Sequence, residues 1–328
     1  MKPPIFFLYD KNGAGKAAFY LLRQSKRDIY QMSTFRVLRN SSFKKFFLTT
    51  FIFFNITVLY VYPEDPLQVI QKEIREGANV NARDKSEYGT TKLMKAVSKG
   101  QYDVAKFLIE HGADVNIKDE YGETALMIAA YNNYINIARL LASKGADIDS
   151  ESGLGATPLM KATPNNSLEV TKLLIGCGVD VNARNNSNVT ALMKAAYNNS
   201  LGVAKMLIEC GADVNAKSKN GWTALRYAAN NNSFEVAKLL IDKGADINSQ
   251  DKYGYTILMT AADNDSFDVS KLLLFKGADL NIRNKDNWSI KDWANENDSS
   301  EIARLVSNTV KHIDANNELK EIEQIKKK

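Results

Sequence analysis

Cysteine and histidine are scarce in this chain of 328 residues, which contains two of each. Two cysteines, Cys177 and Cys210, exclude a disulfide-rich scaffold. Neither cysteine lies near His111 or His312 in the sequence, so no pair is placed for Cys–His chemistry or for a His/Cys metal site. We therefore predict no catalytic residues, no metal site and no cofactor.

An excess of charge of one sign is also missing from most of the chain. The formal net charge is +5, but residues 1–45 contain ten Lys/Arg against Asp10 and Asp28, a local charge of +8. The remaining residues therefore carry −3. Such a balance gives no electrostatic reason to bind nucleic acid, so we predict no nucleic-acid partner.

One unit recurs along the chain every thirty-three residues. A Leu-x-x-Ala pair marks each copy, and a Gly-x-Asp turn marks it again at the same period. The leucines are Leu93, Leu126, Leu159, Leu192, Leu225 and Leu258, and the glycines are Gly112, Gly145, Gly178, Gly211, Gly244 and Gly277. Two independent ladders with one period indicate a stacked repeat architecture.

Each copy predicts two helices and an extended arm. In the copy at Asn185–Asn215, Leu192 begins a short apolar helix, which Asn199 ends because asparagine tolerates a left-handed backbone. Ser200 is placed to cap the second helix, and Gly211 ends that helix at positive φ. A second turn lies in the hairpin arm, shortly before the first helix of the next copy. Its central residue is always Gly or Asn, as positive φ demands. These residues are Gly89, Gly122, Gly155, Asn188, Gly221, Gly254 and Asn287.

This helix–turn–helix with a hairpin arm resembles the ankyrin repeat. Thr157-Pro158-Leu159 and the GADVN sequence of Gly211–Asn215 match two signatures of that family, and the resemblance covers roughly residues 66–306. It implies an all-α repeat solenoid with short β-hairpin arms. The repeats are rich in Asn, Lys and Ile and carry a column of methionines, and in these features they are similar to bacterial ankyrin proteins. Where the family has an inter-repeat histidine, this chain has Met94, Met127, Met160, Met193, Arg226 and Met259, so the rigidity of repeat coupling stays open.

The sequence divides into six segments. They are a basic segment at 1–45, expected to be disordered and with Met32 as an alternative start; a hydrophobic signal or anchor segment at 46–62; an N-terminal half-repeat cap at 63–83; six ankyrin repeats at 84–281; a degenerate C-terminal repeat that acts as a cap at 282–306; and a charged tail at 307–328.

The hydrophobic segment suggests export or membrane anchoring. It has no charged residue and follows Lys44-Lys45, a pattern typical of a signal peptide or membrane anchor. The absence of a small-x-small cleavage site favours an anchor, whereas a length slightly under ~20 residues favours a cleaved signal. The basic flank would keep the N-terminus in the cytoplasm and place the repeats outside it. The alternatives are a buried helix before the first repeat and a cytoplasmic protein.

Aromatic residues mark the candidate binding surface. The resemblance implies that partners meet the hairpin tips and the first helices, and the position before each motif threonine lies there. Trp222, Tyr255 and Trp288 occupy it in the last three units, so we predict one exposed apolar strip rich in hot-spot residue types. Additional candidates are Tyr253, Tyr121, Tyr131 and Tyr197. The alternative is that these rings cover the C-terminal cap or pack on adjacent hairpins.

The sequence therefore predicts a non-catalytic, monomeric protein that binds another protein through its concave hairpin and helix face. We expect it to be exported or tethered to a membrane. The competing interpretation is a structural scaffold or stabilising cap at the membrane that has no discrete partner.

Overall fold

A computed structural model describes residues 5–9, 16–24, 29–34, 65–297 and 300–326. The chain forms two units, Met1–Asp65 and Pro66–Lys328. The described part of the first unit is an antiparallel sheet in the order β1 (Ile5–Tyr9), β2 (Lys16–Gln24) and β3 (Ile29–Thr34). We expected disorder over residues 1–45, and the strands differ from that expectation. These segments are short and rich in aliphatic and aromatic residues, which fits strands, and they show no helical period.

The predicted anchor at residues 46–62 lies outside the described residues, so it stays a prediction. Within the described residues, no helix is long and apolar enough to cross a bilayer.

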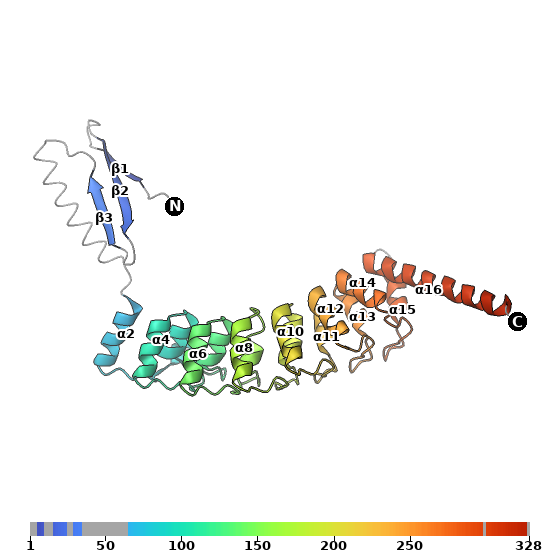
Figure 1. The fold of residues 1–328 in the computed structure, drawn as a ribbon, viewed down its shortest axis with the longest axis horizontal. Coiled ribbons are helices and arrows are strands. Elements are labelled where there is room, and N and C mark those ends of the chain that lie inside the picture. The colour runs from blue at the N-terminus through green and yellow to red at the C-terminus, as the bar shows by residue number, and fades with distance from the viewer. Residues whose placement is uncertain (1–4, 10–15, 25–28, 35–64, 298–299, 327–328) are drawn as a thin grey trace, which may run out of the picture. The chain divides into compact units, whose positions relative to one another are not determined.

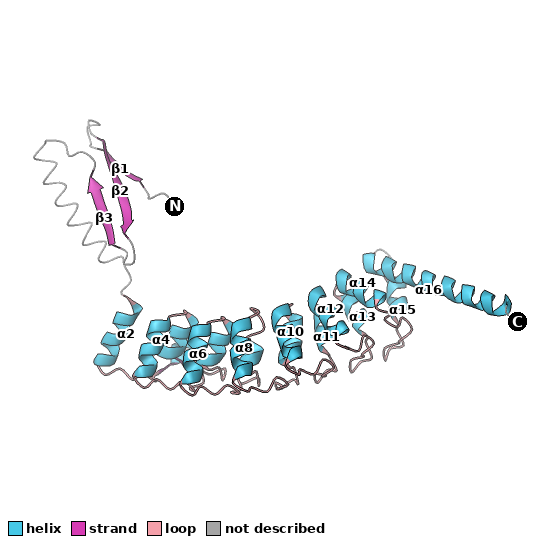
Figure 2. Cartoon of the chain, viewed as in Figure 1, coloured by secondary structure: helices cyan, strands magenta, loops and turns pink. Residues whose placement is uncertain are grey.

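The second unit is a row of helix pairs joined by hairpin arms, and Figures 1 and 2 show the second helices α4, α6, α8, α10, α12 and α14 side by side. It opens with α2 (Pro66–Arg75). The six pairs, numbered here as repeats one to six, are α3 (Lys92–Ser98) with α4 (Tyr102–Glu110), α5 (Ala125–Tyr131) with α6 (Ile135–Ser143), α7 (Pro158–Lys161) with α8 (Leu168–Gly176), α9 (Ala191–Tyr197) with α10 (Leu201–Glu209), α11 (Ala224–Asn230) with α12 (Phe234–Asp242), and α13 (Ile257–Asp263) with α14 (Phe267–Phe275). The last pair is α15 (Ile290–Glu296) with α16 (Glu301–Lys326).

Local sequence sets the ends of these helices. The threonine before each first helix of repeats one to six accepts a hydrogen bond from the backbone N–H three residues on, as Thr190 does from Met193. Asn199 has φ 53° and Gly211 has φ 89°, as predicted. All seven predicted turn residues also have positive φ. Ser200 differs from expectation because its hydroxyl donates to the Thr163 backbone carbonyl of the preceding repeat instead of capping its own helix.

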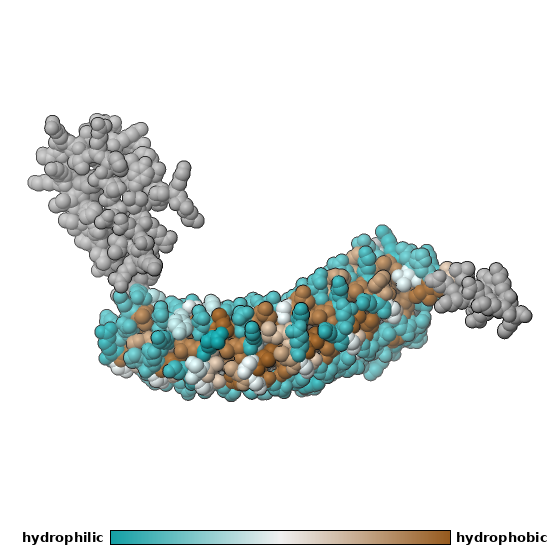
Figure 3. Space-filling model, in the orientation of Figure 1, coloured by the Kyte–Doolittle hydropathy of each residue, from teal (hydrophilic) through white to brown (hydrophobic). Residues whose placement is uncertain are grey.

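The core runs through the stack as one continuous cluster. Leu192 of the first helix and Leu207 of the second are at most 1% exposed, and their equivalents in the other repeats are also buried. Small Ala195 and Ala196 allow the helices to approach closely. Figure 3 shows apolar residues along the length of the stack, flanked by hydrophilic residues at both edges. Because each repeat buries its apolar face only against its neighbours, the stack is stabilised repeat by repeat.

The two ends of the stack depart from the regular unit. The extra residues of the first hairpin form a short 3₁₀ turn, η1 (Lys85–Glu87), between the paired strands β4 (Arg83–Asp84) and β5 (Thr90–Thr91). At the other end, α16 continues to Lys326, so the charged tail expected from residue 307 is an extension of the last helix.

An asparagine ladder couples neighbouring hairpins. Asn116 donates its side-chain amide to the Gly145 carbonyl at 3.0 Å and accepts the Asp147 N–H at 2.8 Å. Asn81, Asn182 and Asn215 form the same pair of bonds with the next repeat. Asp149 replaces asparagine at the end of the second repeat, and a carboxylate cannot donate to the Gly178 carbonyl. The joint between the second and third repeats therefore lacks this donated bond.

Candidate functional site

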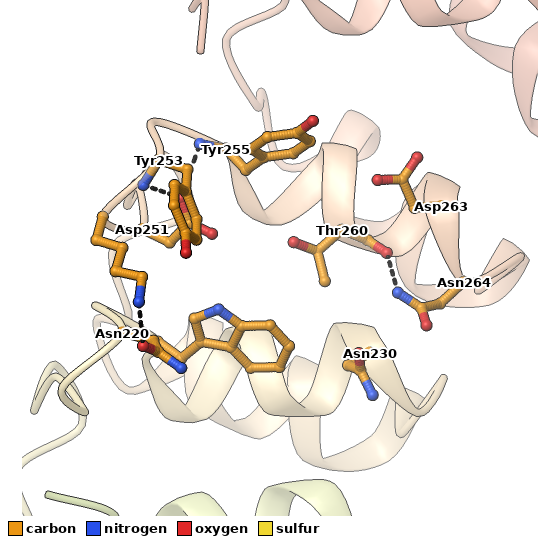
Figure 4. Close-up of a pocket in the computed structure, with 10 residues that line it drawn as sticks. Asn220, Asn230, Asp251, Tyr253, Tyr255, Thr260, Asp263 and Asn264 are labelled. Carbon is orange, nitrogen blue, oxygen red and sulfur yellow. Dashed lines mark hydrogen bonds between the residues drawn. The ribbon is translucent and has the colours of Figure 1, made fainter. Parts of the chain in front are cut away.

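A hollow of about 310 Å³ opens between the fifth and sixth repeats. It combines the first helices α11 and α13 with the hairpin that joins the two repeats (Figure 4). Its lining residues are Asn220, Trp222, Asn230, Asp251, Lys252, Tyr253, Tyr255, Thr260, Asp263 and Asn264. The hollow therefore brings together three of the aromatic residues that the sequence singled out.

A buried arginine lies behind this hollow. Arg226 is 1% exposed and occupies the column that holds methionine in the other repeats. Its guanidinium donates to the Thr260 hydroxyl, the Tyr255 backbone carbonyl and the Ser249 backbone carbonyl, the last at 3.2 Å. Burial lowers the Arg226 pKa to about 10, while the nearby Asp251 carboxylate favours the charged form. Arg226 thus couples the fifth repeat to the sixth.

Asp251 connects this arginine to the hairpin. One carboxylate oxygen accepts the Tyr253 N–H at 2.9 Å and the Tyr255 N–H at 3.0 Å. The other oxygen lies 3.7 Å from the Arg226 guanidinium, and the Asp251 side chain is 7% exposed. The backbone that presents Tyr253 and Tyr255 is therefore fixed by a buried charge pair.

The aromatic strip predicted from Trp222, Tyr255 and Trp288 stays a prediction, although Trp222 and Tyr255 line the same hollow. In the described part of the chain no ring pair joins these three residues. The half-buried Trp222 ring packs edge-on against Tyr227 of α11 at 5.1 Å and lies 5.9 Å from the Arg226 guanidinium carbon. Trp222 thus packs on its own helix while it also lines the hollow beside the next hairpin.

The three predicted strip residues differ in exposure. Trp288 is 40% exposed, whereas Tyr255 is half-buried and packs against the core cluster. Trp222 and Tyr255 are therefore more buried than Trp288, and the choice between a binding strip and rings that pack on adjacent hairpins stays a prediction.

The rim of the hollow contains Lys252 and, besides the paired Asp251, the carboxylate of Asp263. The Lys252 ammonium donates to the Asn220 side-chain oxygen at 2.7 Å and lies 4.9 Å from the centre of the Tyr253 ring. Asp263 ends α13, and burial raises the pKa of its carboxyl despite a hydrogen bond from Trp293. The Asn264 amide donates to the Thr260 carbonyl at 2.9 Å, which leaves the Asn264 side-chain oxygen as an acceptor.

The remaining predicted site residues lie outside this hollow. Tyr121 is 57% exposed and its ring lies 5.2 Å from Tyr88 of the neighbouring hairpin. Tyr131 and Tyr197 are exposed at the ends of α5 and α9, and Tyr197 meets the Tyr227 ring edge-on at 6.4 Å. Tyr121 and Tyr197 therefore make separate ring contacts, on a hairpin and on a first helix.

Sequence reasoning missed Arg226, Tyr227 and Asp263. Arg226 was visible as the single break in the methionine column, which was a signal for a specific contact at that joint. Asp263 had no such signal, because only the stacking of α11 and α13 sets its carboxylate beside the aromatic residues.

Chemistry-bearing groups elsewhere are dispersed. The described residues contain no cluster of three His, Cys, Asp or Glu side chains that could hold a metal ion. Cys177 and Cys210 are free and exposed. The repeated aspartates close turns, as Asp213 does by accepting the Asn215 N–H at 2.9 Å.

Comparison with known families agrees with this architecture. A family model described as "Ankyrin repeats (3 copies)" matches the chain three times, at residues 60–152, 145–218 and 210–284. The chain belongs to the ankyrin-repeat family. A search of curated proteins found no match.

Proposed function

We infer that this chain is a non-catalytic protein that binds another protein through its concave hairpin and first-helix face. Ankyrin repeats are generally protein–protein interaction modules, which supports the class of function. One observation favours a particular region: the hollow between the fifth and sixth repeats has aromatic walls, and its hairpin is fixed by the buried Arg226–Asp251 pair. A fixed aromatic surface loses little conformational entropy on binding, which favours affinity.

The centre of this proposed surface is Tyr253. Its side chain is 57% exposed, and its backbone position is held by Asp251. Removing the ring therefore removes contact area without removing a core residue. Truncation of a binding hot spot costs about 2 kcal/mol or more of affinity.

The test is quantitative capture with the tagged full-length chain. Proteins retained by the wild type are compared with those retained by Tyr253→Ala and by the control Phe275→Ala. Phe275 is 85% exposed at the end of α14 and does not line the hollow. We expect a defined set of proteins to be lost with Tyr253→Ala and kept with Phe275→Ala. Equal retention by all three chains would favour the scaffold interpretation.

We also propose that residues 46–62 export the repeats or anchor them to a membrane. The charge-free run after Lys44-Lys45 supports this location. A reporter that works only outside the cytoplasm, fused after Lys328, should be active. Activity of a cytoplasm-only reporter at the same position would instead place the repeats in the cytoplasm.

A further inference from the structure

We propose that the hollow between the fifth and sixth repeats is a receptor site for an arginine side chain of the partner protein. This inference rests on the proposed function and specifies the chemistry of its occupant. It is carried by the arrangement of aromatic rings, a carboxylate and amide oxygens around one cavity.

The cavity has two chemically different sides. Figure 4 shows Tyr253 and Tyr255 on one side of Thr260, and Asp263, Asn264 and Asn230 on the other. Aromatic faces attract cations through their quadrupole, and guanidinium groups stack on them readily. A guanidinium on the aromatic side would have N–H groups left to donate toward the oxygen-rich side.

The acceptors on the oxygen-rich side suit a side chain that carries several N–H donors. Asp263 offers a carboxylate, and the Asn230 and Asn264 amides each offer an oxygen that accepts no hydrogen bond within the described residues. Arginine has five N–H donors in a planar arrangement and satisfies several acceptors at once. An aliphatic side chain would leave these acceptors unpaired, which is unfavourable on burial.

The Asp263 carboxylate is placed at a cost to folding. It lies at the C-terminal end of α13, where the helix dipole already disfavours negative charge. Partial desolvation also disfavours the ionised form of this otherwise exposed side chain, and the Trp293 hydrogen bond offsets it only in part. No Lys, Arg or His of the described residues forms an ion pair with it. A bound cation would relieve both penalties.

The other charges near the hollow are already paired. Arg226 faces Asp251 below the surface, and the Lys252 ammonium is held by Asn220 beside the Tyr253 ring. The Lys252 contact shows that this rim accommodates a cation against an aromatic face. Asp263 therefore remains as the charge that selects the occupant, and it selects a positive one.

The test uses the full-length chain and four short peptides, Ac-Gly-Xaa-Gly-NH₂ with Arg, Lys, Glu or Leu in the centre. Binding is followed by NMR shifts of the Trp222 indole N–H, since that ring lines the hollow. We expect the arginine peptide to bind most tightly. Asp263→Asn should weaken it about tenfold, because a hydrogen bond to a charged group is lost.

A matched control is Asp103→Asn, which makes the same chemical change on α4 away from the hollow. It should leave arginine binding unchanged. Tyr253→Leu keeps an apolar side chain but removes the ring face, so it should also weaken arginine binding. Melting curves of each variant show that the fold is retained.

Equal binding of the lysine, glutamate or leucine peptide, or full arginine binding by Asp263→Asn, would overturn the proposal. Its failure is distinguishable from failure of the proposed function. If Tyr253→Ala loses captured proteins while the arginine peptide does not bind, the interaction surface stands and the arginine site falls.

Discussion

Arg226 and Asp251 form a buried ion pair across the joint between the fifth and sixth repeats, with their charged groups 3.7 Å apart. Methionine fills the equivalent column in the other repeats. Met160 and Asn185 occupy the positions in the sequence that correspond to Arg226 and Asp251. The sulfur atoms of Met94 and Met259 lie within hydrogen-bond distance of the backbone N–H of the capping threonines of their own helices. Among the described repeats, Arg226 is the residue of this column whose side chain donates hydrogen bonds to the next repeat.

Replacing this arginine tests its coupling role. Arg226→Met should lower the free energy of unfolding by about 3 kcal/mol, because it leaves Asp251 buried without its counter-charge. Adding Asp251→Asn recreates the Met160 and Asn185 combination and should recover most of the loss. Urea unfolding of both variants measures this. Wild-type stability in Arg226→Met would show that the pair does not couple the repeats.

Restoring the missing rung of the asparagine ladder should strengthen the stack. Asp149→Asn would allow donation to Gly178 and acceptance from Asp180, as Asn116 does with Gly145 and Asp147. We expect about 1 kcal/mol of added stability, the net value of a typical hydrogen bond. The reverse change, Asn116→Asp, is the matched control and should destabilise. An unchanged urea midpoint in Asp149→Asn would contradict the prediction.

Removing a buried hydroxyl that has no hydrogen-bond partner should raise the free energy of unfolding. Ser270 is 0% exposed, and its hydroxyl has no hydrogen-bond partner. The equivalent residue is Ala237 in the fifth repeat. Ser270→Ala should therefore raise the free energy of unfolding by about 1 kcal/mol. The opposite change, Ala237→Ser, should lower it, and thermal unfolding of the two variants tests the pair.

A cavity in the middle of the stack should divide its unfolding. Leu192 is 1% exposed in the fourth repeat, so Leu192→Ala should cost about 2–5 kcal/mol. Because repeats are stabilised by nearest neighbours, the two halves should then unfold in separate transitions. Calorimetry distinguishes two transitions from one. A single transition at the wild-type temperature would be incompatible with this view.

The first hairpin should be sensitive to acid. A hydrogen bond from Lys95, assisted by Ser86, holds the pKa of Asp84 well below its ordinary value. A carboxyl with a lowered pKa stabilises the fold above its ordinary pKa of about 3.9 and loses that contribution as the pH falls. Asp84→Asn should therefore be less stable than the wild type at pH 7, and the difference should shrink toward pH 2.

Lys95→Met serves as the partner variant for the acid test. It removes the main cause of the lowered pKa, so the Asp84 carboxyl should titrate closer to its ordinary value. NMR titration of that carboxyl measures the change directly. An unaltered titration curve in Lys95→Met would remove Lys95 as the cause.

Much of the fold was predictable because its causes are local. A glycine or asparagine at positive φ, a threonine before each first helix and leucine at helical spacing act within a few residues of one another. Repetition then multiplies each local signal, so the elements of six repeats follow from reading one. The short 3₁₀ turn at Lys85–Glu87 was likewise visible as two extra residues.

Contacts between repeats were not predictable in the same way. Trp222 packs on Tyr227 and also lines the hollow beside the next hairpin, and Ser200 bonds to Thr163 of the preceding repeat instead of capping its own helix. The sequence by itself determined the period, the helix ends and the residue types at the hairpins. Only the tertiary structure decided the Arg226–Asp251 pair and the placement of Asp263 beside aromatic rings, because side chains choose among partners that stacking alone brings within reach.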